Sequence, residues 1–379
     1  MVQNLICTVG TSLFGNLTSL EKKYKDSPHL LKTEEKELVE NYSSKNWIGV
    51  AKNLLKFPSS ERICGAEINS ITSMISLNYI PSGCRLFFCC SETDDGKAIG
   101  AILKNYYEAK KQEVKILEIK ALQDRDPKKF RTYGLRNLAK EICKIIRSFS
   151  SSSCAINATG GYKAQIAIAV MLGQAIGVPV YYKHERFDEI ILFPPMPVSL
   201  DFEVWMKASS MLFTLETSRE PVLLEEYKEE WEERFESLVE PVEIDGKNYI
   251  ELSATGQIFH DTFNERFKIN QKELLPPSVK KEDKKEPKWE QSGHMRNYPE
   301  ILKFMKSVTD EIPCVIHCYT YHFNPNLSSL TRFKSAPEGI EGIYSNGTYT
   351  VKFAVKTTAV EPSQINAVVT YLNRWLASK

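Results

Sequence analysis

Five short apolar segments alternate with longer stretches of helical periodicity in residues 1–205. The segments are NLICTVG, RLFFCCS, EVKILEI, CAINATG and VPVYYK, and stretches such as GLRNLAKEICKIIRSF lie between them. This alternation is typical of a parallel sheet with helices on both faces, because such a sheet buries both sides of its strands. The sequence therefore predicts a doubly wound α/β fold, in which ligands bind where loops leave the carboxyl ends of the strands.

Composition adds a general frame. The chain is 42% hydrophobic and 26% charged with a net charge of +1, as expected for a globular protein of two or three domains without a general attraction to nucleic acid. Its nine cysteines include Cys89 and Cys90 inside an apolar run, which indicates reduced core thiols. No secretion signal or membrane span is indicated, so we expect a cytoplasmic protein.

A glycine pair follows the fourth apolar segment. Gly160 and Gly161 allow positive φ angles and close approach of a ligand, and the helix that follows directs its free N–H groups at the turn. Side chains that favour an anion flank the pair: Asn157, Thr159, Tyr162 and Lys163. A tight turn without a ligand is the alternative for this motif alone.

The loops after two further predicted strands are also rich in glycine and hydroxyl side chains. The first offers Thr8, Gly10, Thr11, Ser12 and Asn16, and the second offers Ser91, Glu92, Thr93 and Gly96. Three small, hydroxylated, glycine-bearing loops at one sheet edge favour a phosphate-bearing ligand. The turns do not match the G-x-G-x-x-G dinucleotide fingerprint, which argues against a nicotinamide-dependent dehydrogenase.

The motifs ICTVGTSL, GAEINSI, SETDDG, NATGGYKAQIAIA and YYKHERFDEIILFPPMPVSLDFEVW occur in this order in residues 1–205. Together they resemble the CARF domain, the Rossmann-like sensor of type III CRISPR systems. The resemblance implies a homodimer whose paired crevices bind a cyclic oligoadenylate, with cyclic tetraadenylate the expected activator and no other cofactor. It also leaves open that the CARF domain cleaves its own ligand.

Residues 206–272 have a different pattern of predicted elements. They predict an acidic amphipathic helix around EEYKEEWEERFE, a strand, a DGKN turn, a second strand and a helix that opens at Gly256. This order resembles a winged-helix connector. Because the acidic helix would repel phosphates, we expect a dimerising and transmitting module, with DNA recognition as the alternative. Residues 273–290 contain paired prolines and a Lys/Glu run and predict a solvated linker.

Residues 291–379 predict a small α+β domain with a helix, several antiparallel strands and a closing helix with Pro362 in its first turn. The core string NPNLSSLTRFKSAPEGIEGIYSNGTYTVKFAV is similar to the RelE family of ribosome-dependent mRNA interferases. The resemblance covers about thirty residues. It departs at Glu341 and Ser345, which stand where the family has arginines, so the catalytic set is in doubt.

Metal-free RNA cleavage requires an aligned 2′-hydroxyl and cations that neutralise the developing charge. The candidates are Arg332, Lys334, Tyr349, Lys352 and Lys356. Strand alternation places Tyr349, Val351, Phe353 and Val355 on one face and Thr350, Lys352, Ala354 and Lys356 on the other. An ordinary solvated face is the alternative explanation for each lysine.

Other activities of the C-terminal segment can be tested against the sequence. No histidine has an arginine five to seven residues before it, which excludes the HEPN ribonuclease motif. Cys314, Cys318 and His322 would spread over about 26 Å of one strand, so with His317 they predict no metal site. The EIDGK stretch formally fits a PD-(D/E)xK metal nuclease, which is the runner-up, and a non-enzymatic regulator is a further alternative. The expected function is a cyclic-oligoadenylate-activated ribonuclease that cleaves mRNA on the ribosome.

Overall fold

The computed structural model describes residues 2–185, 187, 189–196, 200–289 and 298–379, and it divides into two compact units, Met1–Ser199 and Leu200–Lys379. The first boundary falls a few residues before the predicted one at 205. The predicted connector and effector lie together in the second unit. The predicted boundary between linker and effector, at 290–291, and Arg186, Asp188 and residues 197–199 of the quoted motif lie outside the described residues.

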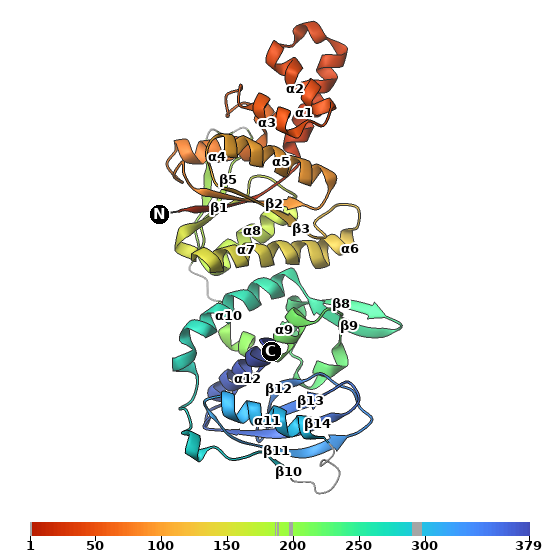
Figure 1. Cartoon of the computed structure of the whole chain (residues 1–379), viewed down its shortest axis with the longest axis vertical. Helices are drawn as coiled ribbons and strands as arrows, with labels where there is room; N and C mark the ends of the chain where they lie inside the picture. The colour runs from red at the N-terminus through yellow and green to blue at the C-terminus, as the bar shows by residue number, and fades with distance from the viewer. Residues whose placement is uncertain (1, 186, 188, 197–199, 290–297) are drawn as a thin grey trace. The chain divides into compact units, whose positions relative to one another are not determined.

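Unit 1, the N-terminal unit, is built on a six-stranded sheet of order β3-β2-β1-β4-β5-β6 (Figure 1). The strands are β1 (Asn4–Thr8), β2 (Arg85–Ser91), β3 (Val114–Ile119), β4 (Cys154–Asn157), β5 (Val180–Tyr182) and β6 (Ile191–Phe193). All five predicted strands are confirmed and run parallel, and β6 adds an antiparallel edge. The order reverses between β1 and β4, which is the topological switch point of a doubly wound sheet.

Helices cover both faces of this sheet, with α4 and α5 on one side and α7 and α8 on the other (Figure 1). The crossover from β1 to β2 is long and carries three further helices. The helical segments are α1 (Ser12–Asp26), η1 (Pro28–Leu30), α2 (Thr33–Ser43), α3 (Trp47–Leu54), η2 (Arg62–Cys64), α4 (Gly65–Ser76), α5 (Asp94–Ala109), α6 (Pro127–Lys129), η3 (Phe130–Gly134), α7 (Leu135–Phe149), η4 (Ser151–Ser153) and α8 (Lys163–Ile176). Strands β1, β2 and β4 are buried almost throughout, which explains their continuous apolar sequences.

Unit 2, the C-terminal unit, contains two sheets, of orders β7-β9-β8 and β10-β11-β14-β13-β12. The strands are β7 (Val222–Leu223), β8 (Val239–Ile244), β9 (Lys247–Leu252), β10 (Lys288–Trp289), β11 (Val315–Asn324), β12 (Arg332–Ala336), β13 (Gly339–Ser345) and β14 (Thr350–Thr357). The helical segments are α9 (Phe202–Thr217), η5 (Leu224–Glu230), η6 (Glu233–Leu238), α10 (Ala254–Leu274), η7 (Lys281–Asp283), α11 (Pro299–Glu311) and α12 (Pro362–Ala377).

The five-stranded sheet buries one face against α11 and α12. Phe333, Val351, Phe353 and Val355 are at most 3% exposed and pack with apolar residues of these two helices. The predicted alternation along residues 350–356 is therefore confirmed: the valines and Phe353 face the core, and Lys352 and Lys356 face away from it.

The acidic stretch does not form the predicted α-helix. Residues 224–238 form two 3-10 segments separated by an extended Trp231. Tertiary contacts determine this conformation: Tyr227, Phe235 and Leu238 are buried in the core of unit 2, and carboxylates of the first segment bind cations of β12. Sequence periodicity reports neither contact.

The described part of the predicted linker is mostly exposed, as predicted, but it is anchored to the fold at several points. Strand β10 pairs with β11, and the amide of Val279 donates to the carbonyl of Pro313. The ammonium group of Lys284 donates to carbonyl oxygens of Thr309 and Ile312, at the carboxyl end of α11. In the sequence, Lys284 is one charge in a Lys/Glu run. In the fold it caps α11 and holds this segment in place.

Candidate functional site

The loops that leave β1 and β4 touch at the switch point of unit 1. A Cβ atom on Gly10 would lie 2.5 Å from the backbone nitrogen of Gly161, so only glycine fits at position 10. Gly161 has a φ of +106°, which glycine adopts without strain. The two predicted glycine turns therefore form one compact structure.

Some predicted ligand-binding side chains support these loops instead of facing outward. Thr8 is 1% exposed and donates to the carbonyl of Gly160, and Asn157 is 2% exposed and donates to the hydroxyl of Ser70 at 2.8 Å. Thr159 donates to Asn157 Oδ1 and accepts from the amide of Lys183. These three residues therefore stabilise the loops from within the fold.

Glu67 on α4 is a buried residue that supports the loops after β1 and β4, and sequence analysis missed it. Its Oε1 accepts a hydrogen bond of 2.8 Å from the Gly10 amide, and its side chain is buried. Burial raises the pKa of Glu67 to about 6, against the opposing effect of the Gly10 hydrogen bond. The signal in the sequence was a single carboxylate in the apolar GAEINSI stretch.

Side chains also occupy part of the predicted anion-binding backbone. Gly10 gives its N–H to Glu67, and Tyr162 gives its N–H to Gln165 Oε1 at 2.5 Å. Lys163, the first residue of α8, is exposed and makes no ion pair with the described residues. Lys163 is thus a cation of this turn that is available to a ligand.

The loops after β1 and β2 present hydroxyl groups at the starts of α1 and α5. Thr11 and Ser12 are exposed, and Ser12 Oγ accepts from the Ala66 amide at 3.1 Å. Thr93 caps α5 by accepting from the Gly96 amide at 3.1 Å. The remaining predicted residues are Asn16, which donates to the Arg62 carbonyl; Ser91, which bonds the Thr93 hydroxyl; and Glu92, which is partly exposed.

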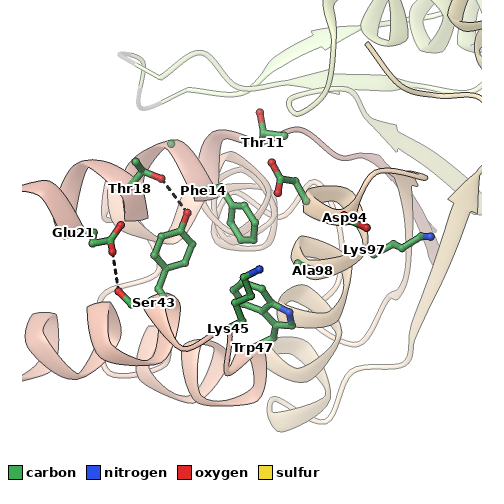
Figure 2. Close-up of a pocket in the computed structure, with 13 residues that line it drawn as sticks. Thr11, Phe14, Thr18, Glu21, Ser43, Lys45, Trp47, Asp94, Lys97 and Ala98 are labelled. Atoms are coloured by element: carbon green, nitrogen blue, oxygen red, sulfur yellow. Dashed lines mark hydrogen bonds between the residues drawn. The ribbon is translucent and has the colours of Figure 1, made fainter. Parts of the chain in front are cut away.

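A pocket of about 800 Å³ begins at Thr11 and extends between α1, α2, α3 and α5 (Figure 2). Phe14, Tyr42 and Trp47 line it, with the Phe14 ring centroid 5.3 Å from Tyr42 and 5.4 Å from Trp47. Charged groups of both signs complete the lining: Glu21, Lys45, Asp94, Asp95 and Lys97. A pocket with aromatic rings and edge acceptors suits a nucleobase better than a bare phosphate.

In unit 2, two predicted catalytic cations of β12 are already paired. Arg332 is 4% exposed, forms an ion pair with Glu230, donates to the Glu226 carbonyl and lies 4.7 Å from the centroid of the Tyr227 ring. The ammonium group of Lys334 lies 2.7 Å from Glu229. Both cations thus contact the acidic segment 224–230.

Glu341 joins Lys334 and Lys352 on the same face of the sheet. Its Oε1 lies 3.4 Å from the Lys334 ammonium group and 3.6 Å from that of Lys352, and its Oε2 accepts from the Tyr321 hydroxyl. The side chain is 10% exposed, and burial raises its pKa. The position that breaks the RelE pattern is therefore the centre of a charged cluster.

The other predicted catalytic residues lie apart from Glu341. Tyr349 is on the core side of the sheet, where its hydroxyl donates to Glu300 of α11 at 2.5 Å. Lys356 is exposed farther along β14, with its ammonium group 5.8 Å from the centroid of the Tyr319 ring. Tyr321, which sequence analysis did not select, provides the hydroxyl on the lysine face.

Possible metal ligands are dispersed. Within the described residues, no group of three or more His, Cys, Asp or Glu side chains could hold an ion. Cys318 faces the core, whereas His322 pairs with Lys352 on the opposite face. The EIDGK stretch forms the tip of the β8–β9 hairpin, with Glu243, Asp245 and Lys247 exposed.

Comparisons with known proteins give one family match. Residues 62–196 match the model of a family described as CRISPR-associated protein (Cas_APE2256). No curated protein matches significantly. The solved structure of Can2 from Sulfobacillus thermosulfidooxidans in complex with cyclic tetra-adenylate matches with a TM-score of 0.24 and 11% identity, over 96% of this chain and 79% of that chain. A similarity this low supports no argument about fold or function. Among the described residues, no helix is long and apolar enough to cross a membrane.

Proposed function

We propose that the chain is a cyclic-oligoadenylate-activated ribonuclease of type III CRISPR defence, with the sensor in unit 1 and the nuclease in unit 2. The observation that carries the sensor proposal is the meeting of the loops after β1 and β4 at the switch point, with the loop after β2 beside them. The family match over residues 62–196 supports the connection to CRISPR systems.

The crevice has the chemistry for a ring of phosphates. Thr11 precedes α1 without capping it, Thr93 caps α5, and the exposed Lys163 begins α8, so three helix N-termini and a cation face anionic groups in the proposed site. The neighbouring pocket offers Phe14 and Trp47 to an adenine ring, and Asp94 or Asp95 can accept from its amino group. Cyclic tetraadenylate combines both features, and its two-fold symmetry suits a site shared by two copies of the chain.

The Glu341 cluster has the groups that RNA transesterification needs. In this reaction the 2′ oxygen attacks the adjacent phosphorus and passes its proton to the Glu341 carboxylate. Lys352 gives a proton to the departing 5′ oxygen, and Lys334 neutralises the phosphate, so the products are a 2′,3′-cyclic phosphate and a 5′-hydroxyl. A raised pKa makes Glu341 a better proton acceptor than an ordinary carboxylate.

The PD-(D/E)xK alternative has less support. Its formal motif lies on an exposed hairpin, and a metal nuclease needs at least two carboxylates that converge on the ion. A non-enzymatic regulator would use the same sensor with a unit 2 that only binds a partner. The cleavage experiment below separates these three outputs.

Translating ribosomes should be incubated with the protein, with and without cyclic tetra- or hexaadenylate, and the cuts mapped. We expect mRNA cuts only when a ring is present. Lys352→Ala should lower the cleavage rate roughly a hundredfold, because one preorganised charge is lost. Lys303→Ala, an exposed lysine of α11 on the other side of the sheet, is the matched control and should cleave normally.

Three results would overturn this proposal. If no ring induces cuts, the non-enzymatic regulator is the remaining interpretation. Cleavage of DNA that requires added Mg²⁺ and is insensitive to Lys352→Ala would identify a metal nuclease. Cleavage at the same rate without a ring would show that unit 1 does not control unit 2.

A further inference from the structure

The acidic segment 224–230 lies against the basic strand of the proposed nuclease. Glu229 lies 2.7 Å from the Lys334 ammonium group, and Glu230 pairs with Arg332. These cations alternate along β12 and share one face with Glu341 and Lys352, as the strand register requires. The segment thus covers one end of the face that carries the Glu341 cluster.

The carboxylates of Glu229 and Glu230 occupy the cations that could otherwise pair with backbone phosphates of RNA. Consecutive phosphates are bound in proteins by rows of Lys and Arg, and a carboxylate forms the same charge-assisted hydrogen bonds with them. Arg332 and Lys334 are at most 9% exposed on their side chains. Burial of two cations is costly unless an anion pairs with them, so the carboxylates of segment 224–230 stabilise the two cations that this segment covers.

We infer that this face, from Arg332 and Lys334 to Lys352, binds the phosphate backbone of single-stranded RNA and that segment 224–230 competes with RNA for it. The inference rests on the proposed function for its choice of RNA. It adds a regulatory element: the resting protein holds its own carboxylates where substrate phosphates bind. The competitor is part of the same chain and needs no second protein.

Glu229 can leave the face while Tyr227 keeps the segment anchored in the core of unit 2. Glu229 has a side chain that is 77% exposed, so its ion pair is screened by solvent and is weaker than a buried pair. The 3-10 conformation has poorer hydrogen-bond geometry than an α-helix.

Binding of a fluorescent single-stranded RNA dodecamer to the full-length protein tests this competition without activator. Glu229→Gln should bind at least fivefold more tightly than the natural chain, because Lys334 loses the nearer of its two carboxylate partners and keeps only Glu341. The logarithmic salt dependence should also become steeper by about 0.7, the value for one further phosphate contact on a single strand. Glu236→Gln removes an exposed charge from the next segment and should bind like the natural chain.

The possible results are distinct. Equal affinities and equal salt slopes for Glu229→Gln and Glu236→Gln would overturn the competition. If Glu229→Gln binds more tightly but no ring induces cleavage on ribosomes, the competition stands and the ribonuclease proposal fails. If rings induce cleavage but Glu229→Gln changes neither affinity nor the rate without activator, the ribonuclease stands and the competition fails. Thermal unfolding of both variants shows that each is folded.

Discussion

Glu67 introduces a buried carboxyl group beneath the glycine turns of the proposed sensor. It holds the Gly10 amide, and a Cβ atom on Gly160 would lie 2.0 Å from its Oε1. The residue therefore fixes the spacing between the β1 and β4 loops. Its burial also makes the stability of unit 1 dependent on pH.

The direction of this dependence follows from the raised pKa. The folded chain holds the Glu67 proton up to a pKa of about 6, whereas the unfolded chain releases it near 4.5. The folded state therefore binds more protons between these values, and the free energy of unfolding falls as pH rises through this interval. Below pH 4.5 both states are protonated and the group contributes no difference.

Glu67→Gln keeps an oxygen acceptor for Gly10 and removes the titration. The variant should therefore gain stability over the natural chain as pH rises. The difference between its free energy of unfolding and that of the natural chain should be roughly 2 kcal/mol larger at pH 7 than at pH 4.5. Denaturant unfolding at several pH values measures this difference, and exposed Glu61→Gln is the control. Parallel pH curves for Glu67→Gln and the natural chain would show that Glu67 has an ordinary pKa.

At the scale of elements, the glycine turns are specific contacts between loops. Gly10→Ala would place a methyl carbon 2.5 Å from the backbone nitrogen of Gly161, and backbone cannot move aside as a flexible side chain does. We expect a loss of about 1–3 kcal/mol in stability and at least tenfold weaker cyclic tetraadenylate binding. Gly83→Ala has open space around its Cβ and should leave both unchanged. Normal ligand affinity in Gly10→Ala would separate the turn from the ligand site.

Strands β1, β2 and β4 could be predicted because each is buried on both faces and reads as an apolar run. The acidic stretch could not, since Glu229 and Glu230 take their positions from Lys334 and Arg332, far away in the sequence. Local periodicity contains no information on such pairs.

Strand β11 illustrates the same limit within one element. Strict alternation would place Tyr319, Tyr321 and Phe323 on one face. The register shifts between Thr320 and His322, so Phe323 turns to the aromatic cluster around Tyr349, while Tyr321 reaches Glu341. A bulge of this kind re-aims side chains without a clear sequence signal. The sequence predicts Tyr349 as the catalytic tyrosine, whereas Tyr321 is the one beside the lysines.

At the scale of the whole molecule, the proposed recognition belongs to one compact unit and the proposed output to the other. The family match lies within unit 1, and the charged sheet face lies in unit 2. The central claim is that unit 1 recognises a cyclic oligoadenylate through a crevice shared between two copies of the chain. Unit 2 can be regulated by a cyclic oligoadenylate only if unit 1 binds one.

Titration calorimetry with cyclic tetraadenylate, compared with linear tetraadenylate, tests this claim most directly. We expect the cyclic ligand to saturate at one ring per two chains, because a symmetric ring needs two equivalent crevices. The linear ligand should bind at least tenfold more weakly, since it pays the entropy of adopting the ring-like conformation. Saturation at one ring per chain, or equal binding of the cyclic and linear forms, would contradict the account.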